Sequence, residues 1–390
     1  MSIEHIVQNE KKYMMHTYGR FNVAIESGKG AVAKDIDGKE YIDFTTGIGV
    51  NALGYCDDGW VKAVSEQLNK VQHISNLYYS PTQVECAKQL CTRTGFDKVF
   101  FGNSGAEVNE CAIKLARKYS FDKYGNGRNE IIALKNSFHG RTVTTLSATG
   151  QDVFHQYFFP FTEGFVFADA NDTDSVKALV NDKTCAVMME LIQGEGGVMP
   201  LEQDFVKDVE KLCRDNDLVL IIDEVQTGVG RTGKLYCYEN YGIEPDIITS
   251  AKGLGGGLPF GACLCGERLS GVLGAGTHGT TFGGNPVACA GVLEILKRVD
   301  NPEFLSQVNE KGEYIREKLL KMDGVTQVRG IGLMIGIVLE KDNAKEVAAR
   351  CVENGLLILT AKNLLRMLPP LNISYEDIDK GLEILEKSLL

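Results

Sequence analysis

Short apolar runs that alternate with amphipathic stretches restrict most strongly how this chain can fold. The runs occupy residues 98–102, 131–134, 185–189, 218–222, 247–249 and 262–265. Most are separated by segments with helical spacing, and further such segments precede them; examples are 59–72, 82–93, 105–123 and 203–216. Short buried strands that alternate with helices are typical of a mostly parallel sheet with both faces covered. The pattern therefore predicts an α/β fold.

The two ends of the chain follow a different pattern. Asp37-Gly38 lies between β-like runs in residues 31–44, which is a strong hairpin signal. After Pro286 we expect helix to about residue 322, then strand-rich 325–339, a helix over 342–354 and a final helix over 375–389. A length of 390 residues suggests about two domains. We expect a large domain over 46–290, and a smaller α+β domain built from 1–45 and 291–390.

Charge and composition exclude several classes of protein. A formal net charge of -11 argues against a nucleic-acid partner, which requires a basic face. The N-terminus lacks the apolar core of a secretory signal, and no apolar run approaches the roughly 20 residues of a membrane helix. The 11 cysteines lack the spacing of a zinc site. We expect a cytoplasmic protein with reduced, mostly structural thiols, no membrane partner and no metal.

The sharpest chemical pattern lies where two of the apolar runs end. Asp223-Glu224 follows 218–222, and Lys252 follows 247–249. Both would lie at the carboxyl edge of the sheet, where α/β folds build ligand sites. A lysine in Gly-rich, weakly polar surroundings can form a Schiff base, and an acid facing a pyridine nitrogen would let a cofactor ring accept carbanion electrons. Taken alone, a solvated lysine and a surface acid pair are the commoner explanations.

Two further segments fit a ligand site. Ser104 and Glu107 predict a capping box at a helix start, which exposes unpaired N–H groups suited to a phosphate. Phe138, in the segment NSFHGRT, would be a core residue or a plate stacked on a flat heterocycle. Arg141 has a planar fork that suits a carboxylate, with a surface arginine as the competing explanation.

One motif is misleading. Residues 228–234, GVGRTGK, fit the GxxxxGK core of a nucleotide-binding loop. Leu235 stands where that loop needs Ser or Thr for magnesium, and five residues separate the preceding strand from the loop. The strand–loop–helix context therefore fails, and we do not expect a nucleotide hydrolase.

Motifs along nearly the whole chain resemble one enzyme family. The segments are NSGAE, SFHGRT, QGEGGV, DEVQTGVGRTGK, AKGLGGGLPFGA, TTFGGNP and LLRMLPPL, within residues 102–371, preceded by TYGRFNVAIESGKGAVAKDIDGKEYIDF. In this order they resemble pyridoxal-phosphate aminotransferases of the subgroup with ornithine, 4-aminobutyrate and acetylornithine aminotransferases. TYGRF, SNLYYSPTQ and ELIQGEGGVMPL most resemble the acetylornithine branch. The family commonly has Pro where Asn22 and Leu191 stand.

The resemblance implies an aspartate-aminotransferase-like large domain and a role for each matching residue. Lys252 would hold pyridoxal phosphate as a Schiff base and move the substrate proton, and Asp223 would pair with the pyridine nitrogen. Gln226 would lie near the phenolic oxygen, and Phe138 would stack on the ring. The expected cofactor-binding residues are Ser104, Gly105, Ala106, Phe138, Asp223, Glu224, Val225, Gln226, Lys252 and, reaching the phosphate of the neighbouring subunit, Thr281. The expected substrate-binding residues are Arg141, Thr280, Arg366, Glu195 and Tyr18.

The resemblance also implies a reaction and an assembly. We expect a homodimer with shared active sites that moves the terminal amino group of N-acetylornithine to 2-oxoglutarate, as in arginine biosynthesis. Succinylornithine, ornithine, 4-aminobutyrate or an acyl-lysine are alternative donors. A non-catalytic cofactor-binding homologue is the alternative from another class. Retention of Lys252 and Asp223 argues against it, because a binding-only protein needs neither a proton shuttle nor an electron sink.

Overall fold

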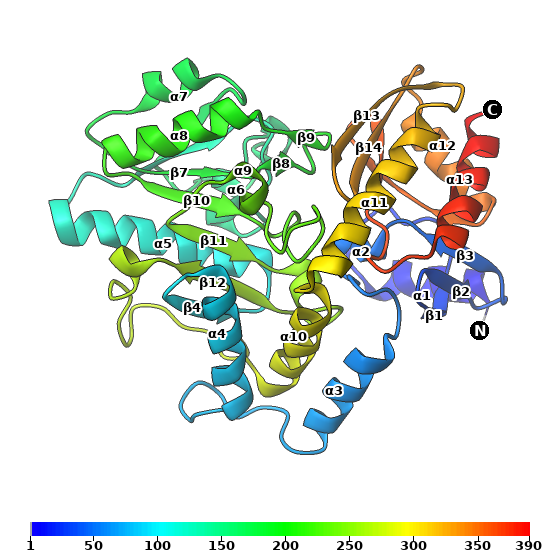
Figure 1. The fold of residues 1–390 in the computed structure, drawn as a ribbon, viewed down its shortest axis with the longest axis horizontal. Helices are drawn as coiled ribbons and strands as arrows, with labels where there is room; N and C mark the ends of the chain where they lie inside the picture. The colour runs from blue at the N-terminus through cyan, green and yellow to red at the C-terminus, as the bar shows by residue number, and fades with distance from the viewer. Residues whose placement is uncertain (1) are drawn as a thin grey trace.

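A seven-stranded sheet forms the centre of the larger part of the molecule (Figure 1). The structure is a computed structural model that describes residues 2–390. The strands in spatial order are β4 (Lys98–Gly102), β12 (Gly261–Cys265), β11 (Ile247–Ser250), β10 (Val219–Asp223), β7 (Thr184–Met189), β5 (Glu130–Leu134) and β6 (Phe165–Ala168). β12 is antiparallel to both of its neighbours, and the other neighbouring strands are parallel. The prediction of a mostly parallel sheet is confirmed.

Helices cover both faces of this sheet. α5 (Gly105–Tyr124) lies on one face, and α7 (Thr173–Leu179) and α8 (Gln203–Asp215) lie on the other (Figure 1). In β10, Val219 and Ile221 join the apolar cluster of α5, whereas Leu220 and Ile222 join the cluster of α8. Because successive strand residues point to opposite faces, a strand between two helical layers must be apolar throughout. This is why the predicted strands appear as continuous apolar runs.

The remaining helices of this part include two that lie close to the predicted segments 59–72 and 82–93, and others for which no bounds were predicted. They are α2 (Thr46–Gly49), α3 (Asp58–Leu68), α4 (Pro81–Thr94), α6 (Val143–Ala148), α9 (Tyr238–Tyr241) and α10 (Pro286–Val299), with short 3-10 turns at Asp152–Phe154, Lys252–Leu254 and Glu267–Leu269. The chain is helical from Pro286 to Leu319, close to the predicted limit of about residue 322, but in two helices. The chain breaks between α10 and α11 (Pro302–Leu319), because Asn301 caps a new helix and Pro302 occupies its first turn.

The smaller part contains two four-stranded sheets. One has the order β13 (Val325–Ile331), β14 (Met334–Leu339), β17 (Leu364–Met367) and β16 (Leu359–Ala361). The other has the order β1 (Ile25–Lys29), β2 (Val32–Asp35), β3 (Glu40–Asp43) and β15 (Leu356–Leu357). The accompanying helices are α1 (Ile3–Tyr13), α11, α12 (Ala344–Glu353) and α13 (Tyr375–Leu389).

Strand pairing joins the two chain ends. β2 and β3 form the predicted hairpin, in which Gly38 has a φ of 86° that favours glycine. β3 then pairs in parallel with β15, where Ile42 lies opposite Leu356. The sheet thus contains residues from both ends of the chain. The domain boundaries near residues 46 and 290 stay a prediction.

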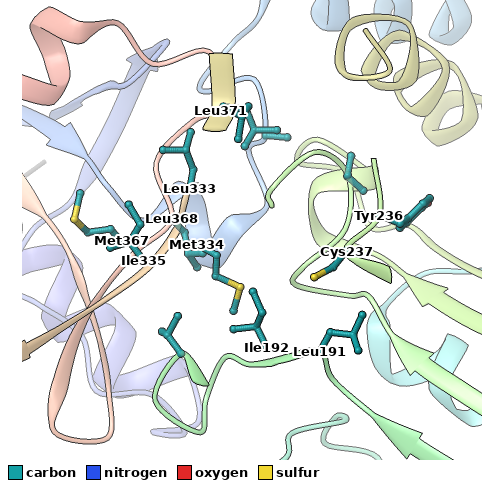
Figure 2. Close-up of a cluster of buried hydrophobic side chains, with 14 of the residues drawn as sticks. Leu191, Ile192, Tyr236, Cys237, Leu333, Met334, Ile335, Met367, Leu368 and Leu371 are labelled. Atoms are coloured by element: carbon teal, nitrogen blue, oxygen red, sulfur yellow. The ribbon is translucent and has the colours of Figure 1, made fainter. Parts of the chain in front are cut away.

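Apolar packing links the two parts of the molecule. Leu191 and Ile192, which follow β7, belong to the same buried cluster as Leu333 and Met334 at the start of β14 (Figure 2). Between these parts, β8 (Ile192–Gln193) and β9 (Met199–Pro200) form a short antiparallel ladder. A close-packed apolar contact of this kind fixes the orientation of neighbouring elements. Within residues 2–390, no helix is both long and apolar enough to span a membrane.

Candidate active site

The predicted site residues gather at the carboxyl ends of the strands of the large sheet. Asp223 ends β10, Lys252 follows β11, Phe138 follows β5 and Ser104 follows β4. β4 runs in the same direction as the parallel strands, because β12 is antiparallel to both β4 and β11. Segments far apart in the sequence therefore meet at one edge.

Lys252 lies partly buried with an unpaired amine. Within residues 2–390, its Nζ atom makes no hydrogen bond or ion pair with another residue. Burial lowers the pKa of Lys252, and the charge of Arg366 lowers it further, against the opposing effect of nearby carboxylates. Its φ of 44° is unusual for a residue with a side chain, and such strain is concentrated at functional sites. A lowered pKa favours the neutral, nucleophilic form of the amine.

Asp223 is held by three hydrogen bonds. Its Oδ2 atom accepts from Asn109 Nδ2 and contacts His139 Nδ1, each at 2.8 Å, and its Oδ1 atom accepts from the Val225 amide at 3.0 Å. Burial opposes a proton on His139, but the hydrogen bond and charge of Asp223 outweigh it and raise the pKa of His139. Only 4% of Asp223 is exposed. These hydrogen bonds fix the orientation of the buried carboxylate.

A second buried acid was missed by the sequence analysis. Glu190 accepts from the Phe138 amide at 2.9 Å, and only 6% of the residue is exposed. Burial raises the pKa of Glu190 to about 7. Its position directly after β7 was the available signal, because β7 ends at the same edge of the sheet as β10.

Glu224 faces away from the other acids. Its carboxylate accepts from Thr227 Oγ1 and from the Tyr238 amide, within the loop after β10. Burial raises the pKa of Glu224 to about 7. The side chain therefore supports the loop and does not point into the site; a cofactor contact of Glu224 would have to come from its backbone.

The helix start at α5 differs in one detail from the predicted capping box. Ser104 Oγ accepts from the Glu107 amide at 3.2 Å, but the Glu107 carboxylate accepts from the Asn103 amide rather than from that of Ser104. At Gly105, a Cβ atom would lie 2.7 Å from Val225 Cγ1, so the loop after β10 packs tightly on this turn. Ser104, Gly105 and Ala106 thus offer N–H groups beside Asp223.

The two predicted threonines, Thr280 and Thr281, differ in their contacts and exposure near this helix start. Thr280 Oγ1 accepts from Asn103 Nδ2 at 3.1 Å, which places Thr280 beside it. Thr281 is exposed.

Tyr18 is 73% exposed and, with other residues of 3–24, lines a cavity of about 720 Å³. None of the other predicted site residues lines that cavity.

The two predicted substrate arginines have opposite surroundings. Arg366 is only 2% exposed, and its Nη1 atom lies 2.7 Å from Glu195 Oε1 and 3.3 Å from Gln226 Oε1. Its Nε atom is buried without a hydrogen-bond partner. Arg141 is exposed and lies 4.3 Å above the Phe154 ring and 5.6 Å from the Phe138 ring. Among the described residues, Arg141 pairs with no carboxylate.

This set of groups fits pyridoxal phosphate. An unpaired amine suits its aldehyde, a buried carboxylate suits its pyridine nitrogen, and a helix start with hydroxyls suits its phosphate. Each of these groups lies at the same edge of the sheet. The chemistry of the residues agrees with the cofactor that the motifs imply.

Comparisons with known proteins agree with this arrangement. The family model of aminotransferase class-III matches residues 13–389. The acetylornithine aminotransferase of Haemophilus ducreyi is 48% identical over 100% of this chain and 99% of its own length. The acetylornithine aminotransferase of Methanocaldococcus jannaschii is 45% identical over 99% of this chain and 98% of its own length.

Solved structures show the same fold. The ornithine aminotransferase of Toxoplasma gondii superposes with a TM-score of 0.95 at 30% identity, covering 100% of this chain and 95% of that one. The N-acetylornithine aminotransferase of Stenotrophomonas maltophilia has a TM-score of 0.85 at 35% identity, with 98% of each chain covered. The chain belongs to the class-III aminotransferase family. It is a transaminase that depends on pyridoxal phosphate.

Proposed function

We propose that this enzyme transfers the terminal amino group of N-acetylornithine to 2-oxoglutarate, a step of arginine biosynthesis. The observation that carries the proposal is 45–48% identity over essentially full length to acetylornithine aminotransferases from several organisms. Arg141 and Arg366 also support this pair of substrates. Ornithine aminotransferases also match over the full length, but at a lower identity of about 30%.

The charges of the site suit the two substrates. N-acetylornithine has one carboxylate and a neutral amide, whereas glutamate and 2-oxoglutarate have two carboxylates. Arg141 is free to bind the carboxylate that both share, bidentately. Arg366 is paired with Glu195, so that no unpaired buried guanidinium remains when the second carboxylate is absent. We infer that Glu195 swings away when glutamate binds.

Lys252 and Asp223 would perform the central chemistry. Pyridoxal phosphate, when bound, supplies an electron sink for the electrons released at the substrate carbon. Lys252 Nζ holds the cofactor and then carries the proton from that carbon, a task that its lowered pKa favours. Asp223, held by Asn109 and His139, keeps a proton on the pyridine nitrogen.

The remaining predicted residues would position the cofactor. We assign Ser104, Gly105 and Ala106 to the phosphate, and Phe138 to the face of the ring. Val225 and Gln226 follow Asp223 closely in the chain, and we assign Gln226, which contacts Arg366, to the phenolic oxygen. Thr280 and Tyr18 are assigned to the substrate.

We also propose a homodimer in which Thr281 reaches the phosphate bound by the neighbouring subunit. Large apolar side chains next to Thr281 are exposed: Leu77 by 86%, Tyr79 by 96% and Phe282 by 61%. Asn76 donates to the carbonyls of Thr280 and Gly283, so these two segments form one surface. An exposed apolar surface of this kind indicates a protein contact.

We also propose that the protein is cytoplasmic. All 11 cysteines are free, and most are buried. Free thiols in this number are typical of a reducing compartment.

A half-reaction screen tests the substrate assignment. The holoenzyme is mixed with N-acetylornithine, succinylornithine, ornithine, 4-aminobutyrate or an acyl-lysine, and the change in the visible absorption of the cofactor is followed. We expect the highest kcat/KM for N-acetylornithine. A higher value for another donor would overturn the substrate, and no spectral change with any donor would overturn catalysis itself.

A further inference from the structure

Phe154 is an aromatic residue beside the site that the sequence analysis did not single out. It ends the short 3-10 turn Asp152–Phe154, which follows α6. Its ring and that of Phe138 meet edge to face, with centroids 5.9 Å apart and an angle of 67° between the planes. Arg141 lies over the Phe154 ring, with its Cζ atom 4.3 Å from the centroid. Phe154 therefore contacts both the residue assigned to the cofactor ring and the one assigned to a substrate carboxylate.

Hydrogen bonds fix this turn against the loop after β5. The Gly150 amide donates to Ser137 Oγ at 3.0 Å, and Gln151 Nε2 donates to the Ser137 carbonyl at 2.9 Å. The Phe154 amide donates to the Gln151 carbonyl at 3.0 Å. Phe138 directly follows Ser137 in the chain. The position of the Phe154 ring is therefore set by the same loop that carries Phe138.

The guanidinium of Arg141 has aromatic rings as its neighbours and no acid. Within the described part of the chain, it donates to no other residue and pairs with no carboxylate. An arginine side chain has many rotamers, so fixing it when a ligand binds costs affinity unless it is already held. A cation–π contact with the face of a ring holds the guanidinium but leaves its N–H edges free. Such an arginine can bind a carboxylate without first losing a partner.

The two arginines of the site are thus held in different ways. Arg366 is paired with Glu195 at 2.7 Å, a partner that must leave before a carboxylate can bind. Arg141, over Phe154, needs no such exchange. In the proposed reaction, a carboxylate lies at Arg141 in both half-reactions, but at Arg366 only with glutamate or 2-oxoglutarate. A permanent aromatic partner suits the first task, and an exchangeable acid suits the second.

We propose that Phe154 is a positioning residue that holds Arg141 ready for the carboxylate common to both substrates. The inference rests on the proposed function, in which Arg141 binds that carboxylate. In N-acetylornithine the carboxylate lies at the opposite end of the carbon chain from the amino group that reacts. Loss of the ring should therefore weaken binding and leave the reacting step nearly unchanged, so that KM rises and kcat does not fall.

The test follows the half-reactions of the holoenzyme with N-acetylornithine and with N-acetyl-1,4-diaminobutane, which lacks only the carboxylate. The ratio of the two kcat/KM values measures what the carboxylate contributes. Phe154→Leu keeps the apolar bulk but loses the aromatic face, and it should lower this ratio about fivefold. With N-acetylornithine alone, the change should appear in KM, with kcat within about twofold of the wild type.

Two further variants separate the aromatic contact from packing. Phe154→Tyr keeps an aromatic face and should keep the ratio of the wild type. Phe121→Leu makes the same change as Phe154→Leu at a position of α5 that is 59% exposed, and it is the matched control. Equal losses of Phe154→Leu with both donors would assign Phe154 to packing alone and would overturn the inference.

Arg141→Gln separates this inference from the proposed function. It should lower the ratio at least as far as Phe154→Leu does, because the planar fork that binds a carboxylate is lost. An unchanged ratio in Arg141→Gln would overturn the assignment of the carboxylate to Arg141, and the inference with it. A lowered ratio in Arg141→Gln beside an unchanged one in Phe154→Leu would overturn the inference alone.

Discussion

The buried charged side chains of the active site are held by partners that donate hydrogen bonds to them or carry the opposite charge. Asp223 is a buried carboxylate that accepts from Asn109, Val225 and His139. The buried guanidinium of Arg366 has Glu195. Unpaired buried charges cost several kcal/mol, so each charge needs such a partner until a ligand provides one. Lys252 avoids this cost differently, because burial favours its neutral form.

The first prediction concerns the catalytic lysine. Lys252→Ala should still bind pyridoxal phosphate through the ring and phosphate contacts, but turnover should fall at least about 10⁴-fold, because the group that holds and moves the proton is lost. Steady-state kinetics and the absorption spectrum measure both effects. Lys234→Ala is the matched control; Lys234 ends the GVGRTGK segment and is exposed, so its loss should leave kcat/KM unchanged. Near-normal turnover of Lys252→Ala would remove Lys252 from the mechanism.

The second prediction concerns the proposed switch. Glu195→Gln removes the charge that neutralises Arg366 while keeping the shape of the side chain. The half-reaction with N-acetylornithine should slow about tenfold or more relative to the half-reaction with glutamate, because only the former leaves Arg366 without a carboxylate. Single-turnover absorbance measures the two halves separately. Equal losses in both would reduce Glu195 to a structural role.

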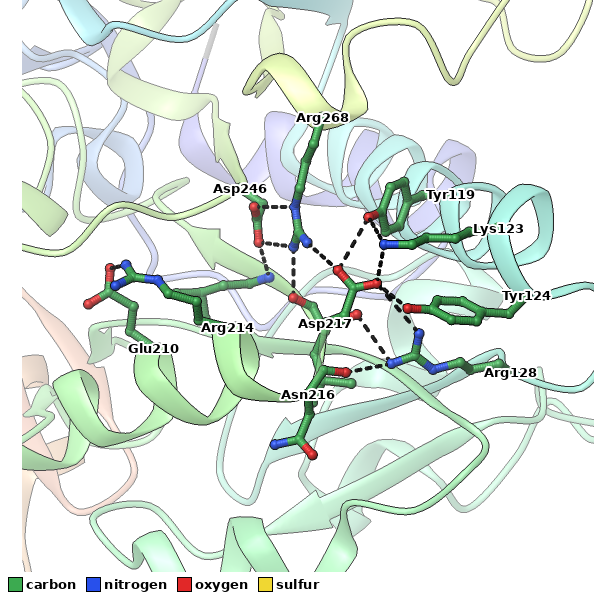
Figure 3. A network of polar contacts seen from close by, with 12 residues as sticks. Tyr119, Lys123, Tyr124, Arg128, Glu210, Arg214, Asn216, Asp217, Asp246 and Arg268 are labelled. Carbon is green, nitrogen blue, oxygen red and sulfur yellow. Dashed lines mark hydrogen bonds and ion pairs between the residues drawn. The ribbon is translucent and has the colours of Figure 1, made fainter.

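At the scale of elements, a polar network holds the sheet together at the edge opposite the active site. Asp217, just before β10, accepts from Lys123 and Tyr124 of α5 and from Arg268, which also binds Asp246 before β11 (Figure 3). The network therefore links one helix to the starts of two neighbouring strands. Its carboxylate is about one third exposed, so each pair contributes modestly.

The third prediction follows from the charge of Asp217. Burial opposes the charged form, but the hydrogen bonds from Lys123 and Tyr124 outweigh it and lower the pKa of Asp217. A carboxyl group whose pKa is lower in the folded state stabilises the fold above its unfolded pKa of about 3.9, and this contribution disappears as the pH falls through the folded value. Asp217→Asn should therefore lower the free energy of unfolding by ~1–3 kcal/mol at pH 7, with the difference from wild type shrinking below about pH 4.

Two features make this substitution a clean test. Asp217 has a φ of 51°, a region that asparagine tolerates as well as aspartate, so the backbone is not strained. Asp122→Asn, which breaks an exposed pair with Lys118 within α5, is the control and should cost only about 0.5 kcal/mol. Urea unfolding at pH 7 and pH 3 measures both variants. A loss in Asp217→Asn that does not depend on pH would assign the effect to packing and not to charge.

At the scale of the whole molecule, the apolar surface around Thr281 is exposed and has no partner within the described chain. It combines residues of 76–79 with those of 280–283, next to the helix start that we assign to the phosphate. A twofold contact through this surface would place Thr281 of one subunit near the site of the other.

The fourth prediction tests this shared site. Thr281→Ala should speed the loss of pyridoxal phosphate about tenfold during dialysis, because a hydroxyl partner of a phosphate contributes roughly 1–2 kcal/mol. Thr326→Ala, at an exposed position in β13, is the control and should retain the cofactor as the wild type does. Sedimentation at micromolar concentration should show at least a dimer. A fully active monomer would exclude a site shared between subunits.

Much of the fold follows from local patterns. The apolar runs predicted six of the seven strands of the large sheet, all except β6, because a strand between two helical layers is apolar on both sides. The final helix was predicted with its observed bounds, Tyr375–Leu389. The division of the helix after Pro286 was missed, although Asn301 and Pro302 provide a local start signal.

The candidate site could also be predicted from the sequence only in part. The positions of Asp223 and Lys252 at strand ends could be read from the sequence, because each directly follows its own apolar run. The partners of these groups could not. Asn109 lies 114 residues from Asp223, and Glu195 lies 171 residues from Arg366. Which side chains meet across such separations depends on the order of the strands and on the direction in which each side chain leaves its element, and only the tertiary structure decides both.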